Sequence, residues 1–202
     1  CHEPHGTPYF RLLYGIGDTA MTYPGGYTFT EAAPVADGNS RRTNIGDSGE
    51  EIHGQHTAYL SGMSDWCGNC HAGMHSDMTT NFVHPVAVNV GSTNSGNYNA
   101  YVTTGDLTGA YATAYMPLVP FEDAANTVTS LTGTMANSQV MCLTCHRAHA
   151  SPYPDAGRWD FAADILEDTH PIGDPYYTYY DGNPLVMTTQ RSLCNKCHLK
   201  DN

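Results

Sequence analysis

Three copies of the pattern Cys-x-x-Cys-His constrain this chain more than any other feature of its sequence. They occupy residues 67–71, 142–146 and 194–198. The pattern is typical of a c-type haem site, in which two thiols bond to the vinyl groups of the haem and the histidine binds the iron. Zinc is the alternative, because four thiolates from two such pairs form a tetrahedral site. Since a histidine directly follows every pair, the sequence favours three covalently bound haems.

The chain opens on a fragment of the same pattern. Residues 1–5 read Cys-His-Glu-Pro-His, which is the end of a haem motif without its first three residues. A free or disulfide-bonded thiol at Cys1 is the alternative. We expect instead a fourth motif that lacks at least its first cysteine. Four haems c would then be bound through Cys1, Cys67, Cys70, Cys142, Cys145, Cys194 and Cys197.

A core made of ordinary apolar side chains is not available to this chain. Leu, Ile, Val and Phe supply 31 of its 202 residues, and the formal net charge is −12. A share of these residues below about 20 per cent, with a large net charge, is typical of disordered chains. Haems would supply the missing apolar surface, so we predict a core of stacked porphyrins wrapped by polypeptide. The acidity argues against nucleic-acid binding, and no apolar run reaches membrane-spanning length.

The predicted fold class is mostly irregular coil, with short helices confined mainly to the haem motifs and little strand. We expect a single tetrahaem domain over residues 1–202, with one haem pair at about 1–100 and a second at about 120–202. We find no exact repeat beyond the haem motifs. Local patterns predict three further elements, namely a short strand at 9–14, a short helix at 106–115 and a weak helix at 155–167.

Eleven histidines are available to bind iron. Four follow a cysteine directly and are expected to be the proximal ligands: His2, His71, His146 and His198. The other seven are candidates for the second axial position: His5, His53, His56, His75, His84, His149 and His170. Two imidazoles on each iron would give low reduction potentials. Methionine is the alternative ligand, and the ample supply of histidine speaks against it.

Three of these candidates stand out by their spacing. His5, His75 and His149 each lie three or four residues beyond a proximal histidine. Each can therefore reach a second haem that is stacked face to face with the haem of its own motif. We expect the first two haems to exchange ligands through His5 and His75, and His149 to reach the fourth haem. The third haem then needs a ligand from elsewhere. The candidates are a neighbouring molecule, His53, His56, His84 and His170.

Several stretches of the sequence resemble the extracellular multihaem cytochromes of metal-reducing bacteria that polymerise into conductive filaments. The matching stretches are residues 61–71, 83–85, 105–109, 118–122, 142–151 and 191–198. The resemblance implies a coil fold, a continuous chain of bis-histidine haems, head-to-tail polymerisation, and a histidine that ligates a haem of the next subunit. The six-haem members carry two more motifs upstream. The sequence is therefore expected to be a four-haem protein lacking a few N-terminal residues or the C-terminal part of a longer one.

The resemblance and the histidine supply favour an electron-transfer protein over an enzyme. We expect a homopolymeric filament, exported through the periplasm to the cell surface, that passes electrons to other redox proteins and extracellular metal oxides. A reductase of a small oxyanion is one alternative, and it would require a haem with an open axial position. A monomeric periplasmic electron shuttle is another.

Overall fold

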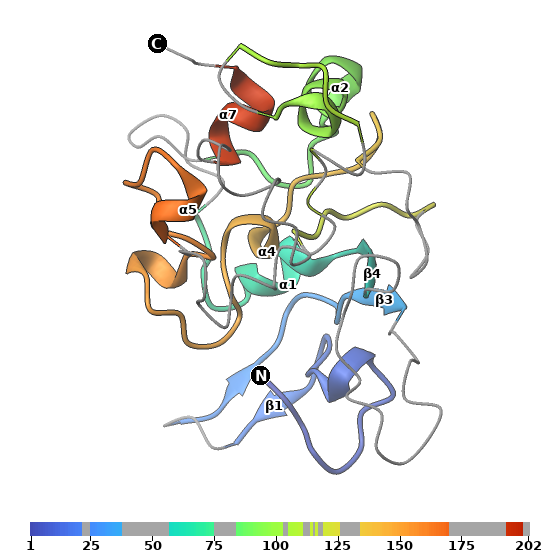
Figure 1. Ribbon diagram of the computed structural model, residues 1–202. Coiled ribbons are helices and arrows are strands. Elements are labelled where there is room, and N and C mark those ends of the chain that lie inside the picture. The colour runs from blue at the N-terminus through green and yellow to red at the C-terminus, as the bar shows by residue number, and fades with distance from the viewer. Residues whose placement is uncertain are drawn as a thin grey trace, which may run out of the picture.

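Irregular backbone makes up most of the computed structural model (Figure 1). The structure describes residues 1–21, 25–37, 57–74, 84–102, 105–110, 114, 116, 119–125, 134–169 and 193–199. The elements in chain order are η1 (Phe10–Leu12), β1 (Thr19–Ala20), β2 (Tyr27–Thr28), β3 (Val35–Asp37), β4 (Ala58–Ser61), α1 (Met63–Gly68), α2 (Gly91–Ala100), α4 (Cys142–Cys145), η2 (Pro154–Ala156), α5 (Leu166–Thr169) and α7 (Leu193–His198). The predicted class of coil with short helices and little strand is confirmed.

The strands form two small antiparallel sheets in the N-terminal part of the chain. Strands β1 and β2 pair Thr19 with Thr28, and β3 and β4 pair Ala36 with Tyr59. The strand predicted at 9–14 is wrong, because the 3-10 turn η1 occupies the middle of that segment. Its backbone is left-handed at Arg11 (φ 51°), so the alternating apolar residues do not lie on one extended strand.

Three of the helices coincide with haem motifs. Helix α1 contains Cys67, α4 runs from Cys142 to Cys145, and α7 contains the last pair of cysteines. Residues three apart lie on one face of a helical turn, which is the arrangement that brings both thiols of Cys-x-x-Cys to the same side. The motif spacing therefore explains why these short segments are helical despite their polar surroundings.

Helix α2 contains no haem motif and is the longest of the described helices. Its sequence, Gly-Ser-Thr-Asn-Ser-Gly-Asn-Tyr-Asn-Ala, has no apolar stripe, so the expectation that helices lie mainly at the motifs missed it. Packing supplies its stability. Helix α2 lies against α7 (Figure 1), Tyr98 is fully buried, and the Asn97 side chain donates a hydrogen bond to the Cys197 carbonyl.

The two other predicted helices are confirmed only in part among the described residues: Ala114 is helical and its N–H donates to the Ala110 carbonyl at 2.9 Å. Residues 106–110 are not helical. They fold back over the end of α2, where Gly109 donates to the Ala100 carbonyl at 2.9 Å. A Cβ on Gly109 would lie 2.6 Å from that carbonyl oxygen, which explains the glycine. Between 155 and 167, helical structure is limited to parts of η2 and α5.

Nine of the buried apolar side chains form two clusters, and haem-motif cysteines pack against both. Met63, Met141 and Leu143 pack with Cys67. The larger cluster packs against Cys145 and Cys197, and its buried members are Val90, Tyr98, Met116, Val119, Phe121 and Trp159. The apolar core is thus arranged around the motifs. No helix within the described ranges is long and apolar enough to cross a membrane.

Candidate haem sites

The second and third haem motifs lie against each other. Helix α1 packs on α4 (Figure 1), and the Cys67 and Cys142 thiols are in hydrogen-bond contact. This hydrogen bond, together with burial, raises the pKa of Cys67 far above its ordinary value. The Ser64 hydroxyl accepts a hydrogen bond from the Cys142 backbone N–H at 3.2 Å, which ties the two helices together.

The fourth motif approaches the third from α7. Burial raises the pKa of Cys145 to about 12, and the nearby Cys194 and Cys197 thiols add to that rise. Burial also raises the pKa of Cys197, to about 11. These thiols are therefore protonated and unreactive as nucleophiles at neutral pH. Thioethers, which carry no ionisable proton, fit such an apolar environment without this cost.

The arrangement of donors does not support the zinc alternative. A zinc site needs three or four Cys, His or carboxylate side chains around one point. Across the ranges that the structure describes, no three such side chains gather in this way.

Two pairs of histidines have the spacing of ligands on opposite faces of one iron. The ring centroids of His2 and His149 lie 6.0 Å apart with planes inclined by 25°. Those of His84 and His198 lie 6.2 Å apart with planes inclined by 65°. A metal–imidazole bond is about 2 Å long and the ring centroid lies about 1 Å further, so two opposed ligands have centroids about 6 Å apart.

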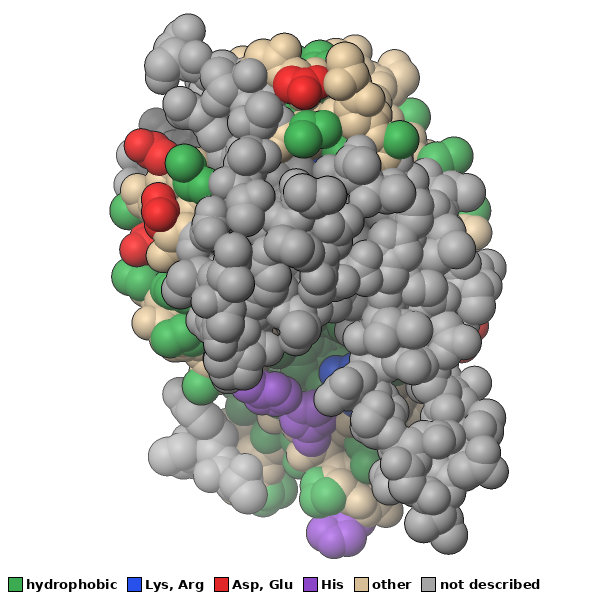
Figure 2. All heavy atoms as spheres, viewed as in Figure 1, with side chains coloured by type: hydrophobic (Ala, Val, Ile, Leu, Met, Phe, Trp, Pro, Cys, Tyr) green, Lys and Arg blue, Asp and Glu red, His purple; other side chains and the backbone are tan. Residues whose placement is uncertain are grey.

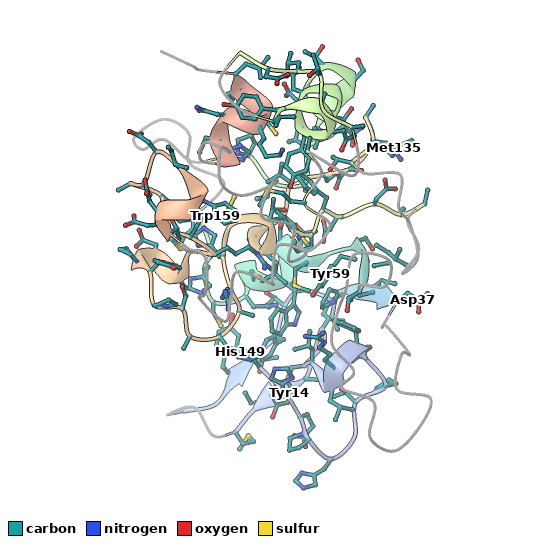
Figure 3. All side chains as sticks on the ribbon, in the orientation of Figure 1. Tyr14, Asp37, Tyr59, Met135, His149 and Trp159 are labelled. Carbon is teal, nitrogen blue, oxygen red and sulfur yellow. The ribbon has the colours of Figure 1, made fainter. Side chains whose placement is uncertain are left out.

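These contacts differ from the expected partners. His149 lies beside His2 rather than beside the proximal histidine of the fourth haem, and Figure 3 shows it next to the N-terminal segment that carries Tyr14. His84, expected among the candidates for the third haem, lies beside His198. His53, His56, His75 and His170 fall outside the described residues. Histidine side chains reach the surface in the lower part of the molecule in Figure 2.

Two of the histidines predicted as proximal ligands are held by backbone carbonyls. The Nδ1 atom of His2 lies 2.8 Å from the Arg11 oxygen, and that of His146 lies 2.7 Å from the Asp155 oxygen. A carbonyl oxygen only accepts hydrogen bonds, so Nδ1 carries the proton in both rings. The other ring nitrogen, Nε2, is then the one that can bind a metal.

These two histidines belong to a structural repeat that relates residues 1–14 to 145–158. Both segments read Cys-His-x-x-His-x-(Ser/Thr)-Pro-Tyr, and we call them the first unit and the second unit. In the first unit Glu3 donates to the Leu12 oxygen and Tyr14 to the Cys1 oxygen. The equivalent bonds of the second unit join Arg147 to Ala156 and Arg158 to Cys145. The sequence shows no exact repeat beyond the haem motifs, although the Pro-Tyr that follows both Cys-His-x-x-His segments was a visible signal.

Lys196 was not identified as a site residue from the sequence. It lies between the cysteines of the fourth motif and is fully buried. Its ammonium group donates to the Tyr101 oxygen at 3.0 Å and to the Ala114 oxygen at 2.5 Å, and it lies 5.0 Å from the centroid of the Tyr98 ring. Burial lowers its pKa to about 7. The side chain thereby fastens the fourth motif to the end of α2.

Glu122 fastens the second motif in a similar way. Its side chain is 3% exposed, and its Oε1 atom accepts a hydrogen bond from the Met63 backbone N–H at 2.5 Å, at the start of α1. Burial raises the pKa of this carboxyl group, and the negative charge of nearby Asp65 raises it further. The folded protein therefore holds the proton of Glu122 more tightly than the unfolded chain does.

The raised pKa of Glu122 predicts that the stability of the protein depends on pH, and that Glu122→Gln removes this dependence. The contribution of Glu122 to the free energy of unfolding is greatest below its unfolded pKa and is lost as pH rises through the raised folded pKa. Glu122→Gln keeps the acceptor for Met63 without the charge, so we expect it to raise stability at neutral pH and flatten this dependence. Glu122→Ala leaves the N–H unpaired and should cost about 1–3 kcal/mol. Denaturant titrations of the haem-loaded proteins at several pH values would measure both, and equal pH slopes for Glu122→Gln and the parent would contradict the prediction.

Comparison with known proteins gives a consistent result. No protein-family model matches the chain. The C-type cytochrome OmcS of Geobacter sulfurreducens is 36% identical over 226 aligned residues, which cover 95% of this chain and 51% of OmcS. The chain thus spans about half the length of this curated relative.

Two solved structures resemble the fold described above. One is the Outer Membrane Cytochrome S filament from Geobacter sulfurreducens, with a TM-score of 0.70 and 35% identity, and the other is a cryo-EM structure of OmcS nanowires from the same organism, with a TM-score of 0.71 and 33% identity. Each match covers 96% of this chain and 55% of the other. Sequence and structure agree with the cysteine and histidine arrangement: nearly the whole of this chain resembles about half of OmcS, a c-type cytochrome.

Proposed function

We propose that this chain is an electron-transfer subunit that carries four covalently bound haems and polymerises into an extracellular filament. The observation that carries the proposal is the pair of histidine contacts, His2 with His149 and His84 with His198, at the spacing of opposed iron ligands. An iron with both axial positions filled by protein exchanges electrons but has no position for a substrate. The protein is accordingly proposed to be an electron carrier with no catalytic residues.

The haems supply one-electron exchange between ferric and ferrous iron when bound, and the polypeptide holds and orients them. Cys1, Cys67, Cys70, Cys142, Cys145, Cys194 and Cys197 are the proposed attachment points. His2, His71, His146 and His198 are the proposed proximal ligands. Imidazole ligation on both faces keeps reduction potentials low. His53, His56, His75 and His170 remain predicted candidates for the irons of His71 and His146.

The contacts between motifs support a continuous path for electrons through the subunit. The third motif touches the second through Cys142 and the fourth through Cys145, and its His149 reaches the histidine of the first. The predicted division into a haem pair near 1–100 and another near 120–202 does not account for the contact between His149 and His2. We therefore propose the third motif as the junction of all four sites.

A homopolymeric filament is proposed from the relatives, whose structures are titled as a filament and as nanowires. A head-to-tail interface that does not close into a ring produces such a polymer. The proposed route of export is through the periplasm, and the proposed acceptors are other redox proteins and extracellular metal oxides. Because each subunit carries a formal charge of −12, assembly must overcome electrostatic repulsion that salt screens.

We further propose that His5 is the ligand donated to a neighbouring subunit. In the second unit, the equivalent histidine, His149, reaches across to His2 of the first unit. His5 instead has a side chain that is 88% exposed. Glu3 fixes it, because Oε1 of Glu3 accepts from the His5 backbone N–H at 3.0 Å and lies 3.3 Å from its Nδ1. This contact leaves Nε2 of His5 available to bind an iron outside the subunit.

The repeat also suggests which iron receives His5. Within one subunit, the last histidine of the second unit, His149, lies beside His2 of the first unit. If the first unit makes the equivalent contact with the second unit of a neighbouring subunit, then His5 lies beside His146 of that subunit and ligates the same haem. Among the side chains that the structure describes, the ring beside His146 is that of Phe161, with centroids 5.7 Å apart, and not another histidine. This haem is the one for which the sequence also failed to supply a ligand.

Spectroscopy of the purified, haem-loaded filament tests the function. We expect every ferric haem to be low-spin at room temperature and the reduced protein to bind no carbon monoxide, because both axial positions are occupied. A high-spin signal from one haem in each subunit, with reduction of a small oxyanion, would overturn the proposal in favour of a reductase. A stable monomer at physiological salt, measured by size separation, would overturn the filament and leave a shuttle.

A further inference from the structure

The strongest unexplained feature of the repeat is the backbone that holds its proximal histidines. His2 and His146 each place Nδ1 against the carbonyl oxygen of the residue nine positions later, Arg11 and Asp155, at 2.8 and 2.7 Å. An antiparallel bridge then joins each histidine to the residue eleven positions later. The same local architecture is therefore built twice in one chain.

Both carbonyls belong to left-handed turns. Arg11 has φ 51° and Leu12 has φ 57°, and the equivalent Asp155 and Ala156 have φ 57° and 52°. None of these residues is glycine, although this region is unfavourable for residues that carry a side chain. An unfavourable conformation that recurs at equivalent positions is held there by the surrounding contacts, which here are the bridge to the histidine and the hydrogen bonds of the unit.

What the two turns share is the backbone and not the side chains. The first residue of the turn is a cation in one unit, Arg11, and an anion in the other, Asp155. The second residue is Leu12 in one and Ala156 in the other. The function that the two turns share therefore cannot depend on their side chains. The common element is the carbonyl oxygen that the left-handed turn directs at Nδ1.

A hydrogen bond from Nδ1 has a defined effect on a histidine that binds iron through Nε2. It fixes the ring orientation and makes the imidazole a stronger electron donor. A stronger donor stabilises ferric iron more than ferrous iron, which lowers the reduction potential. Rotating the turn into the right-handed region would swing the carbonyl away from Nδ1 and remove this effect.

We propose that the left-handed turns at Arg11–Leu12 and Asp155–Ala156 are positioning elements that lower the reduction potentials of the haems bound by His2 and His146. This inference rests on the proposed function only in assuming that these two histidines bind haem iron. The turns act through the histidines and touch no reacting atom. The first and third haems are therefore both expected to have lowered reduction potentials.

A matched pair of substitutions at Ala156 tests the proposal. Ala156 is exposed and its side chain is a single methyl group, so little packing is lost. Ala156→Pro forces φ to about −65° and disfavours the helical regions for the preceding residue, so it abolishes the turn. Ala156→Gly allows the left-handed conformation to persist. The first unit is unchanged in both variants and provides an internal reference.

Spectroelectrochemical titration of the haem-loaded variants gives the decisive measurement. We expect Ala156→Pro to raise the reduction potential of one haem. The expected change in its reduction equilibrium constant is on the order of tenfold, which corresponds to 59 mV for one electron. Ala156→Gly should leave all potentials close to those of the parent. A high-spin signal from that haem in a folded Ala156→Pro protein, showing that His146 has left the iron, would support the proposal in stronger form.

Equal potentials in the proline and glycine variants, with all haems low-spin, would overturn the proposal while leaving the proposed function intact. Absence of a haem at His146 in the parent protein would overturn the proposed function instead. If Ala156→Pro fails to fold, Ala156→Val replaces it, because a β-branched residue is strongly disfavoured at positive φ. The valine variant is expected to shift the same haem in the same direction by a smaller amount, and no shift would overturn the proposal.

Discussion

Replacing His5 by alanine is expected to abolish filament assembly while leaving the subunit folded and loaded with haem. The His5 side chain is 88% exposed and contributes no buried contact to its own subunit, so its loss should not affect subunit stability. A coordinate bond across each interface would be lost. Since about 1.4 kcal/mol corresponds to a tenfold change in affinity, a bond worth only about 3 kcal/mol would raise the critical concentration on the order of a hundredfold.

Electron microscopy and sedimentation across a concentration series would measure the assembly of His5→Ala. Glu3→Gln is the matched control, because the glutamine oxygen can still accept from the His5 backbone N–H, and it should assemble nearly as well as the parent. Free imidazole should restore the low-spin spectrum of the haem that lost its ligand without restoring filaments. Filaments of normal length at normal concentration in His5→Ala would show that this histidine is not the bridging ligand.

Replacing His149 or His84 by alanine is expected to convert one haem in each subunit to a high-spin form that binds carbon monoxide. Each substitution removes one of two opposed imidazoles, from the iron of His2 in the first case and from that of His198 in the second. The two changes should add in the double variant, because they act on different haems. Quantitative spectra of the ferric and the reduced carbon monoxide forms would measure the fraction converted.

Electron paramagnetic resonance identifies which haem has changed. Nearly parallel imidazole planes split two iron d orbitals, whereas strongly inclined planes leave them nearly equal in energy and give a more anisotropic signal. The planes are inclined by 25° for His2 and His149 and by 65° for His84 and His198. His84→Ala should therefore remove the more anisotropic low-spin signal and His149→Ala the less anisotropic one. Low-spin spectra that are unchanged in either variant would contradict the corresponding pair.

The fold class could be predicted from the sequence because two of its causes are local. The chain has too few apolar residues for an ordinary core, which predicted irregular coil around stacked haems. The spacing of Cys-x-x-Cys, in turn, favours a helical turn at the motifs. Helix α2 could not be predicted, because its residues are polar on every face. Its stability comes from packing against α7, far along the chain, and from the burial of Tyr98.

The histidine partners could be predicted only in part. Spacing alone predicted that His149 approaches a haem site other than that of its own motif, and its ring does lie beside that of His2. Which haem it approaches depends on how distant segments meet, and the first and second units meet only in three dimensions. The left-handed turns could not be predicted either. Nothing in Arg11-Leu12 or Asp155-Ala156 resembles a glycine-containing turn, and the conformation follows from bonds made elsewhere in each unit.

The contact between Cys67 and Cys142 has a consequence for the biogenesis of the protein. Two neutral thiols on packed helices, in hydrogen-bond contact, are poor nucleophiles, whereas bonding to a haem vinyl group needs a reactive thiol. A chain that folds before haem attachment would therefore hold the thiols of the second and third sites in an unreactive form together. Maturation therefore has a required order: haem must be attached before helices α1 and α4 pack together, and a chain that folds first cannot bind haem at these sites. The packing that brings the second and third motifs together thus requires an early haem supply during assembly of the protein.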